Sequence, residues 1–151
     1  MLQYDFEQSV GYWVTTAAHA FERELNVELT PHGITFRQMQ VLGCLAMLGA
    51  VTQAELAERM NIEAATLVSV LGRMERDGWI RRQACAEDRR KRLIHPTPKA
   101  EPAWAKVVAC ARKIRARAVR GMSADEVRLA MRLLETMREN LCPSKVVAEA
   151  S

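Results

Sequence analysis

Apolar residues recur at helical spacing in the first part of the chain and predict an amphipathic helix over about residues 5–28. The segment 29–33, which contains Pro31 and Gly33, is expected to end that helix. Thr35 and Gln38 then form a capping-box pattern, which predicts a second helix running to about Leu48. The apolar positions of the first helix are Phe6, Val10, Trp13, Val14, Ala17, Phe21 and Leu25.

The middle of the chain has the pattern of two helices joined by a short turn. Thr52 and Glu55 repeat the capping signature and open a short helix, which ends at a turn over residues 61–62. From about Glu63 a further helix follows, and Gly78 is expected to close it. Its apolar positions fall on one face and its polar positions, Thr66, Ser69 and Arg73, fall on the other. The apolar positions are Leu67, Val70, Leu71 and Met74.

Two short runs after this helix favour β-strands, over residues 79–83 and 91–95, and a charged loop separates them. Together they predict a β-hairpin with a basic tip. Pro96 and Pro98 are expected to stop the second strand, because proline supplies no backbone N–H. Thr97 and Pro98 suit the start of another helix.

Two more amphipathic helices are predicted within residues 98–142, with Gly121 between them and a capping box at Ser123 and Glu126. The first and last helices of the chain have apolar stripes for which the compact middle region offers no partner. We therefore expect these stripes to pack against each other and against a second subunit, which gives a symmetric homodimer.

The predicted elements follow the order of a winged helix-turn-helix, which is a short helix, a turn, a second helix and a basic hairpin. The predicted fold class is mainly α with a small β-hairpin wing, plus dimerisation helices at both ends. An α-helix fits the DNA major groove, and exposed polar side chains on it can reach base edges. Thr66, Ser69 and Arg73 are the candidate base-reading residues.

The position of the basic residues along the chain supports a nucleic-acid partner more strongly than the net charge does. The formal net charge is +4 and the pI is near 9.1. Residues 81–92 contain six basic and two acidic residues, an excess equal to that of the whole chain. A basic run alone is often a solvated loop, but this one follows a helix of the recognition type, and neutralising phosphates dominates nonspecific DNA affinity. We therefore expect the wing to contact phosphates.

These motifs make the chain similar to the MarR family of bacterial regulators over nearly its full length. Glu55-Leu56-Ala57 matches the start of the family's helix-turn-helix, residues 71–80 match the end of its recognition helix, and residues 97–99 match its strand-to-helix junction. Asp88-Arg89-Arg90 matches the wing motif, and the resemblance implies that Arg90 enters the minor groove while Asp88 orients it. Arg89 and Lys91 are the neighbouring candidates. One MarR-like domain is expected over residues 1–151, with its DNA-binding lobe at about 33–97 and dimerisation helices at about 5–28 and 98–142.

The resemblance also implies how the protein is regulated. Family members mostly release a pseudo-palindromic operator when a small phenolic or other aromatic acid binds between the dimerisation helices and the DNA-binding lobe. Trp13, His19, Arg37 and Trp104 are the candidate effector-binding residues near the helix junction. The plainer alternative is that both tryptophans are core or interface aromatics and that His19 and Arg37 are ordinary surface residues.

Other functions have weaker support in the sequence. A redox switch through Cys85 or Cys142 is one alternative, and an interaction module that does not bind DNA is another. We find no catalytic motif, and the four cysteines and three histidines have no metal-ligand spacing, so we expect no enzyme activity, cofactor or metal. With no apolar run near 20 residues and no signal-peptide pattern, we expect a cytoplasmic protein that does not contact membranes.

Overall fold

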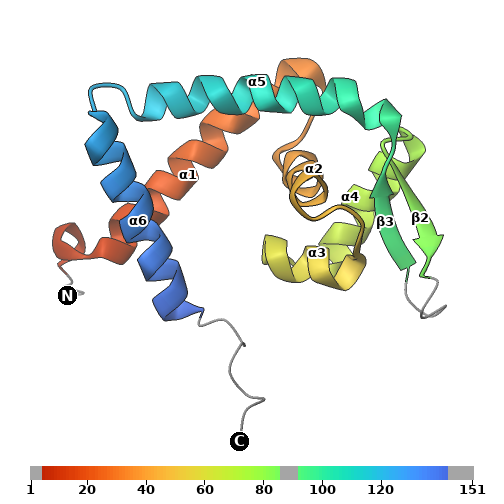
Figure 1. Ribbon diagram of the computed structural model, residues 1–151, viewed down its shortest axis with the longest axis horizontal. Coiled ribbons are helices and arrows are strands. Elements are labelled where there is room, and N and C mark those ends of the chain that lie inside the picture. The colour runs from red at the N-terminus through yellow and green to blue at the C-terminus, as the bar shows by residue number, and fades with distance from the viewer. Residues whose placement is uncertain (1–4, 86–91, 143–151) are drawn as a thin grey trace, which may run out of the picture. The chain divides into compact units, whose positions relative to one another are not determined.

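The computed structural model describes residues 5–85 and 92–142, shown in colour in Figure 1. The chain divides into two compact units, Met1–Ile114 and Arg115–Ser151. The first unit contains a small sheet and most of the helices, and the second contains the end of α5 and all of α6. The helices are α1 (Val10–Leu29), α2 (Phe36–Leu48), α3 (Gln53–Met60), α4 (Ala64–Arg76), α5 (Glu101–Ala118) and α6 (Ala124–Leu141). The strands are β1 (Val51–Thr52), β2 (Ile80–Ala84) and β3 (Arg92–Pro96).

The first helix begins later than the hydrophobic pattern predicted. Residues Phe6–Gln8 form a 3-10 turn, and α1 starts at Val10. Ser9 is the N-cap because its backbone is extended and its hydroxyl accepts a hydrogen bond from the Tyr12 N–H at 3.4 Å. The prediction of one helix from residue 5 was therefore wrong in its first turn, since apolar spacing does not register a capping serine.

Three predicted capping boxes are confirmed. They begin α2 at Thr35 and Gln38, α3 at Thr52 and Glu55, and α6 at Ser123 and Glu126. In each, a hydroxyl accepts from a backbone N–H at the third helical position while the side chain there accepts from the cap's own N–H. These local hydrogen bonds fix where each helix begins.

The sheet has three antiparallel strands in the order β1-β3-β2, where the sequence predicted only the β2–β3 hairpin. The third strand, β1, is two residues long, and its buried Val51 pairs with Ile94. Two residues are too few to produce a strand pattern in the sequence, so β1 was missed. Its effect is to make β3 the central strand and to attach the wing to the helix-turn-helix.

The second strand ends at Pro96, as expected, although Pro96 itself is still paired, opposite Ile80. Its neighbour Thr97 donates its N–H to the Trp79 carbonyl at 2.9 Å. Because successive N–H groups of a strand point to opposite sides, the Pro96 nitrogen faces away from β2. It faces the side where β1 has already ended, so the missing N–H breaks no ladder hydrogen bond.

The hydrophobic core of the first unit lies between the helix-turn-helix and the start of α5. Its fully buried side chains include Leu56 of α3, Leu67 and Leu71 of α4, and Ile94 of β3. Leu29 at the end of α1 and Val107 of α5 belong to the same cluster. The core therefore fixes the orientation of α4 relative to the sheet, which is what places the candidate site.

The second unit is built around α6, which runs from its Ser123 cap to Leu141. None of its residues is buried, and several of its large apolar side chains are 46% to 83% exposed. Among the helices in the described part of the chain, none is both long enough and apolar enough to cross a membrane.

Candidate DNA-binding interface

Helix α4 buries one face in the core and exposes the other to solvent. Leu67, Leu71 and Met74 each have no solvent exposure, and they recur every three or four residues on one face. The helix begins after Glu63, whose carbonyl accepts from the Leu67 N–H at 3.2 Å. Asp77 is the C-cap of the helix, and the φ of +76° at Gly78 lets the chain turn sharply into β2. The remaining surface of α4 is presented to solvent in a fixed orientation.

The three predicted base-reading residues all lie on that open side. Thr66, Ser69 and Arg73 are exposed. Two more residues of α4 that were not predicted to contact DNA are also exposed. They are Val68, which is 49% exposed, and Arg76. A rotation of about 100° per residue puts Arg76 nearly opposite the buried face, so helical geometry was the signal that could have identified it. Arg73 and Arg76 give this face positive charge near the end of the helix.

The wing separates into a described base and a tip that the structure does not cover. Four predicted DNA contacts, Asp88, Arg89, Arg90 and Lys91, lie outside the described residues, and their roles stay predictions. Arg81 and Arg92, at the base, are exposed. Both basic side chains are therefore available to a polyanion.

Arg82 is directed differently from the other basic residues at the base of the wing. It pairs with the buried Ile94 and so projects from the same side of the sheet, toward α4. Its Nε atom lies 3.7 Å from a carboxylate oxygen of Glu75, too far for a hydrogen bond, and finds no hydrogen-bond partner among residues 5–85 and 92–142. This ion pair joins the wing to the recognition helix, so Arg82 is a bracing residue and not one of the cations open to DNA.

The start of α5 is attached directly to the end of the recognition helix. The Thr97 hydroxyl donates to the Gly78 carbonyl, and the Thr97 N–H donates to the Trp79 carbonyl at 2.9 Å. The Lys99 stem passes over Gly78, so closely that a Cβ added there would lie 3.1 Å from it. These contacts join the segment that leads into α5 to the end of α4.

A cavity of about 350 Å³ lies beside this junction, between α2 and the start of α5. Most of its lining is apolar, and the Trp104 ring forms part of the wall. Among the residues that the structure describes, Thr97 and Glu101 are the polar side chains of the lining, and no lysine, arginine or histidine belongs to it. The other lining residues are Leu42, Leu45, Ala46, Pro96, Pro98 and Ala100.

Of the four candidate effector residues, the structure brings only Trp104 to this cavity. Trp13 is 58% exposed on α1, and its indole N–H donates to the Glu7 carbonyl at 2.9 Å. His19 is exposed on the same helix. Arg37, near the start of α2, donates to the Gln40 side chain at 2.8 Å. The four residues do not converge on one site within the first unit.

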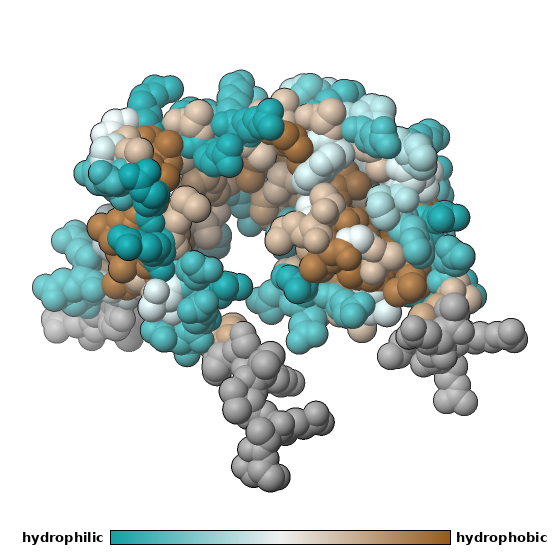
Figure 2. Space-filling view, viewed as in Figure 1, coloured by the Kyte–Doolittle hydropathy of each residue, from teal (hydrophilic) through white to brown (hydrophobic). Residues whose placement is uncertain are grey.

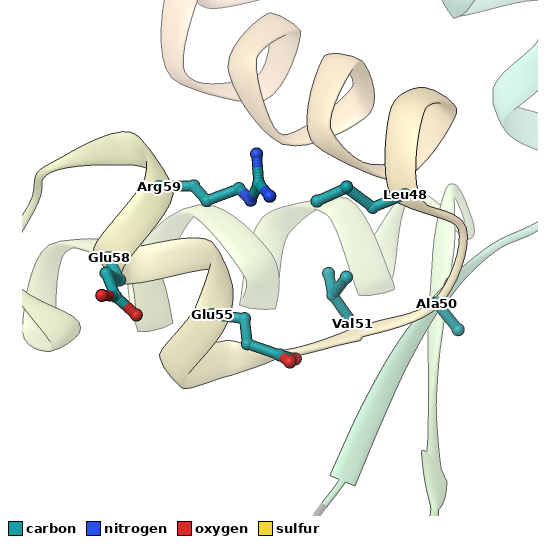
Figure 3. Close-up of a pocket in the computed structure, with 6 residues that line it drawn as sticks. All are labelled: Leu48, Ala50, Val51, Glu55, Glu58 and Arg59. Carbon is teal, nitrogen blue, oxygen red and sulfur yellow. The ribbon is translucent and has the colours of Figure 1, made fainter. Parts of the chain in front are cut away.

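A second, more polar hollow lies between the end of α2 and α3 (Figure 3). Arg59 extends toward Leu48 across it, whereas Glu58 points away. Glu55 also lines it, but its carboxylate accepts from the Thr52 N–H and hydroxyl, both at 2.7 Å. With one of its carboxylates committed to a helix cap, this hollow lacks the convergent polar groups of a ligand site.

Neither a metal nor a thiol centre is evident in the part of the chain that the structure describes. No three His, Cys, Asp or Glu side chains among residues 5–85 and 92–142 are grouped to hold a metal ion. Cys110 is buried, and its thiol donates to the Glu28 carbonyl at 3.5 Å. Cys44 and Cys85 are partly buried, and Cys142 is exposed. The two cysteines of the redox alternative thus differ in access to solvent.

The fold and the exposed, positively charged helix α4 define a winged helix-turn-helix protein. Residues 32–91 match the sequence profile of the MarR family. A relative in Bacillus subtilis, the uncharacterised HTH-type transcriptional regulator YwoH, is 32% identical over 94 residues, covering 62% of this chain and 68% of the relative. The chain belongs to the MarR family and is a DNA-binding transcriptional regulator.

Solved structures agree with this assignment. The transcriptional regulator PA3341 is 31% identical, with a TM-score of 0.79 over 88% of this chain and 98% of that protein. A mutant of MarR from E. coli, in complex with operator DNA, has a TM-score of 0.75 over 85% of this chain and 92% of that one. At 23% identity the second match shows a common fold alone.

Proposed function

We propose that the protein is a homodimeric repressor in which each α4 reads one half-site of a pseudo-palindromic operator. The observation that carries this proposal is the orientation of α4, whose apolar side is fully buried while Thr66, Ser69, Arg73 and Arg76 face solvent. Two such helices related by a two-fold axis would meet the major groove about one helical turn apart. We expect the protein to act in the cytoplasm, where its DNA partner is, and to bind without catalysing a reaction.

The apolar surfaces of α1 and α6 support the homodimer. On α1, Val10, Trp13, Val14 and Phe21 are 40% to 58% exposed, and on α6 several leucines and one methionine are 46% to 83% exposed. Exposed apolar side chains that recur along one helix indicate an interaction surface more strongly than isolated ones do. Figure 2 shows hydrophobic residues, in brown, on the face that it views. A second copy of the chain would cover the apolar side chains of both helices, since closed symmetric dimers are the commonest assembly of soluble proteins.

Removing the wing arginine tests the DNA-binding part of the proposal. Electrophoretic shift on DNA from upstream of the gene should show Arg90→Ala binding about tenfold or more weakly, the loss expected for one well-placed groove contact. Arg23→Ala is the matched control, because that arginine has a 75% exposed side chain on α1, away from the helix-turn-helix. Equal affinity of Arg90→Ala and the parent protein would remove Arg90 from the interface.

We further infer that a small aromatic ligand binding in the cavity beside Trp104 lowers operator affinity. Two proteins with this fold interact with small molecules. CouR from Rhodococcus jostii RHA1 was solved bound to p-coumaroyl-CoA, with a TM-score of 0.81, and DNA binding by BpsR from Bordetella bronchiseptica is regulated by 6-hydroxynicotinic acid. Here the apolar lining suits the ring of an aromatic acid. An acid group would need a partner other than the lining residues, which include Glu101 and no cation.

Titration with phenol and with benzoate, followed by isothermal titration calorimetry, tests this inference. Phenol should bind better, and Ala46→Leu, which fills part of the cavity, should weaken phenol binding while leaving DNA affinity in place. Ala105→Leu, at an exposed α5 position outside the lining, is the control. Ligand binding that Ala46→Leu leaves unchanged would place the effector site elsewhere.

A further inference from the structure

The recognition helix exposes a side chain that has no hydrogen-bonding capacity. Val68 of α4 is 49% exposed, although the helix has a fully buried face at Leu67 and Leu71 that an apolar residue could join. Valine is also a poorer helix former than alanine, so the helix gains nothing from a valine in solvent. The physical reason for this residue therefore lies outside the folded chain.

The DNA major groove offers an apolar group that suits such a side chain. Base edges there present hydrogen-bond donors and acceptors, and thymine alone adds a C5-methyl group. Val68 cannot donate or accept, so the thymine methyl is the base feature with which it can make a favourable contact. Ala65, three residues earlier and exposed beside Val68, extends the same apolar surface.

A second observation on α4 indicates close approach to the groove. Gly72 follows Val68 by four residues and so lies one turn further along the helix. Its φ is not positive, and a Cβ added to it would meet no atom within 4 Å, so the fold itself does not require glycine there. A glycine inside a helix costs stability relative to alanine, and a missing side chain lets the backbone come near a partner. Close approach is what the short Val68 side chain needs to reach a base.

We propose that Val68 is a specificity residue that selects thymine in each operator half-site through contact with the C5-methyl group. Arg73 and Arg76 lie exposed on the same helix and supply the positive charge that holds it against DNA. The proposal rests on the proposed role of α4 as the base-reading helix. It adds a hydrophobic preference to the polar contacts of Thr66 and Ser69.

The test combines a valine truncation with removal of the thymine methyl. Bound duplexes are first selected from a random pool with the parent protein, and each thymine of the selected half-site is then replaced by uracil in both halves symmetrically. For the parent protein, replacing thymine by uracil at one such position should weaken binding by about threefold to fivefold per half-site, which is the contribution of one buried methyl group. In Val68→Ala the same replacement should change affinity by less than about twofold per half-site.

Two controls make the result specific. Val27→Ala removes the same atoms from a valine that is 61% exposed on α1, and it should keep the full thymine preference of the parent. Circular dichroism should show Val68→Ala folded, because the side chain contributes nothing to the core. An equal uracil penalty in the parent and in Val68→Ala would overturn the proposal, as would a selected half-site without thymine.

The outcomes also separate this proposal from the one on which it rests. If no sequence is enriched from the pool, the proposed role of α4 as the base-reading helix fails. If a sequence is enriched but Val68→Ala changes only the mass of the assembly and not the uracil penalty, Val68 belongs to a protein interface. Only the proposed thymine contact fails in that second case.

Discussion

Helices α1 and α4 are both amphipathic, yet they place their apolar residues in opposite environments. In 13 residues α4 buries three side chains, whereas α1 buries only Leu29 in 20 residues. The apolar face of α4 is satisfied within the chain and orients its polar face. The apolar face of α1 remains at the surface, so the same kind of sequence pattern serves folding in one helix and, as we propose, assembly in the other.

The largest expected effect is on the stability of the unit that contains α4. Leu71→Ala should lower the free energy of unfolding by about 2–5 kcal/mol, because it leaves a cavity in a fully packed core. Val68→Ala, three residues away on the open side, should change it by less than about 0.5 kcal/mol. Urea denaturation of the two variants measures the difference. Similar losses for both would contradict the two-sided description of α4.

The next effect concerns α1 and should appear in assembly. Val14→Asp places a charge on the exposed apolar face and should weaken the dimer about tenfold or more, about 1.4 kcal/mol, because the interface would bury that charge. Sedimentation velocity across a concentration series measures this. Thr15→Asp adds the same charge at an exposed position outside the apolar stripe and should leave association unchanged. A Val14→Asp protein with unaltered dimer mass would show that α1 is not at the interface.

A smaller effect separates stability from function within α4. Gly72→Ala should raise the free energy of unfolding by about 0.5–1 kcal/mol, since the added methyl meets nothing in the fold and alanine favours the helix. It should at the same time weaken operator binding, because the methyl separates the helix from the groove. Thermal denaturation and electrophoretic shift on the same preparation measure both. A variant that is more stable and binds equally well would mean that the helix does not approach DNA at Gly72.

The sequence predicted the helices well because their ends are encoded locally. Each capping box at Thr35, Thr52 and Ser123 is a contact between residues three apart, and all three are confirmed. The errors came from features set by tertiary structure. Strand β1 exists because Val51 meets Ile94, more than forty residues away, and Pro96 is tolerated because β1 ends before reaching it.

The sequence predicted the kind of site, a DNA-reading helix, better than the orientation of individual side chains. Helical spacing placed Thr66, Ser69 and Arg73 on the open face of α4, and the structure agrees. The sequence pattern could not show that Arg82 points inward to Glu75, because that depends on the register of β2 against β3. Nor could spacing reveal that Trp104 lines a cavity while Trp13 does not.

The smallest expected effect concerns the start of α6, the other helix with an exposed apolar face. The Ser123 backbone N–H, and then its hydroxyl, hydrogen-bond the Glu126 carboxylate and lower the pKa of Glu126. A lowered folded pKa means that the cap stabilises α6 fully above the ordinary glutamate pKa. This stabilisation is lost as the pH falls through the lowered value.

Helicity followed by circular dichroism between about pH 6 and pH 3 should therefore decrease, and Glu126→Gln should remove part of that pH dependence. Glu58→Gln, at an exposed position of α3 outside the capping boxes, is the control and should keep the parent profile. Because Glu126 is exposed, the change should be slight beside the others, and it would affect the end of α6 without altering the core around α4. A Glu126→Gln profile identical to that of the parent would mean that the capping box contributes nothing to the pH dependence.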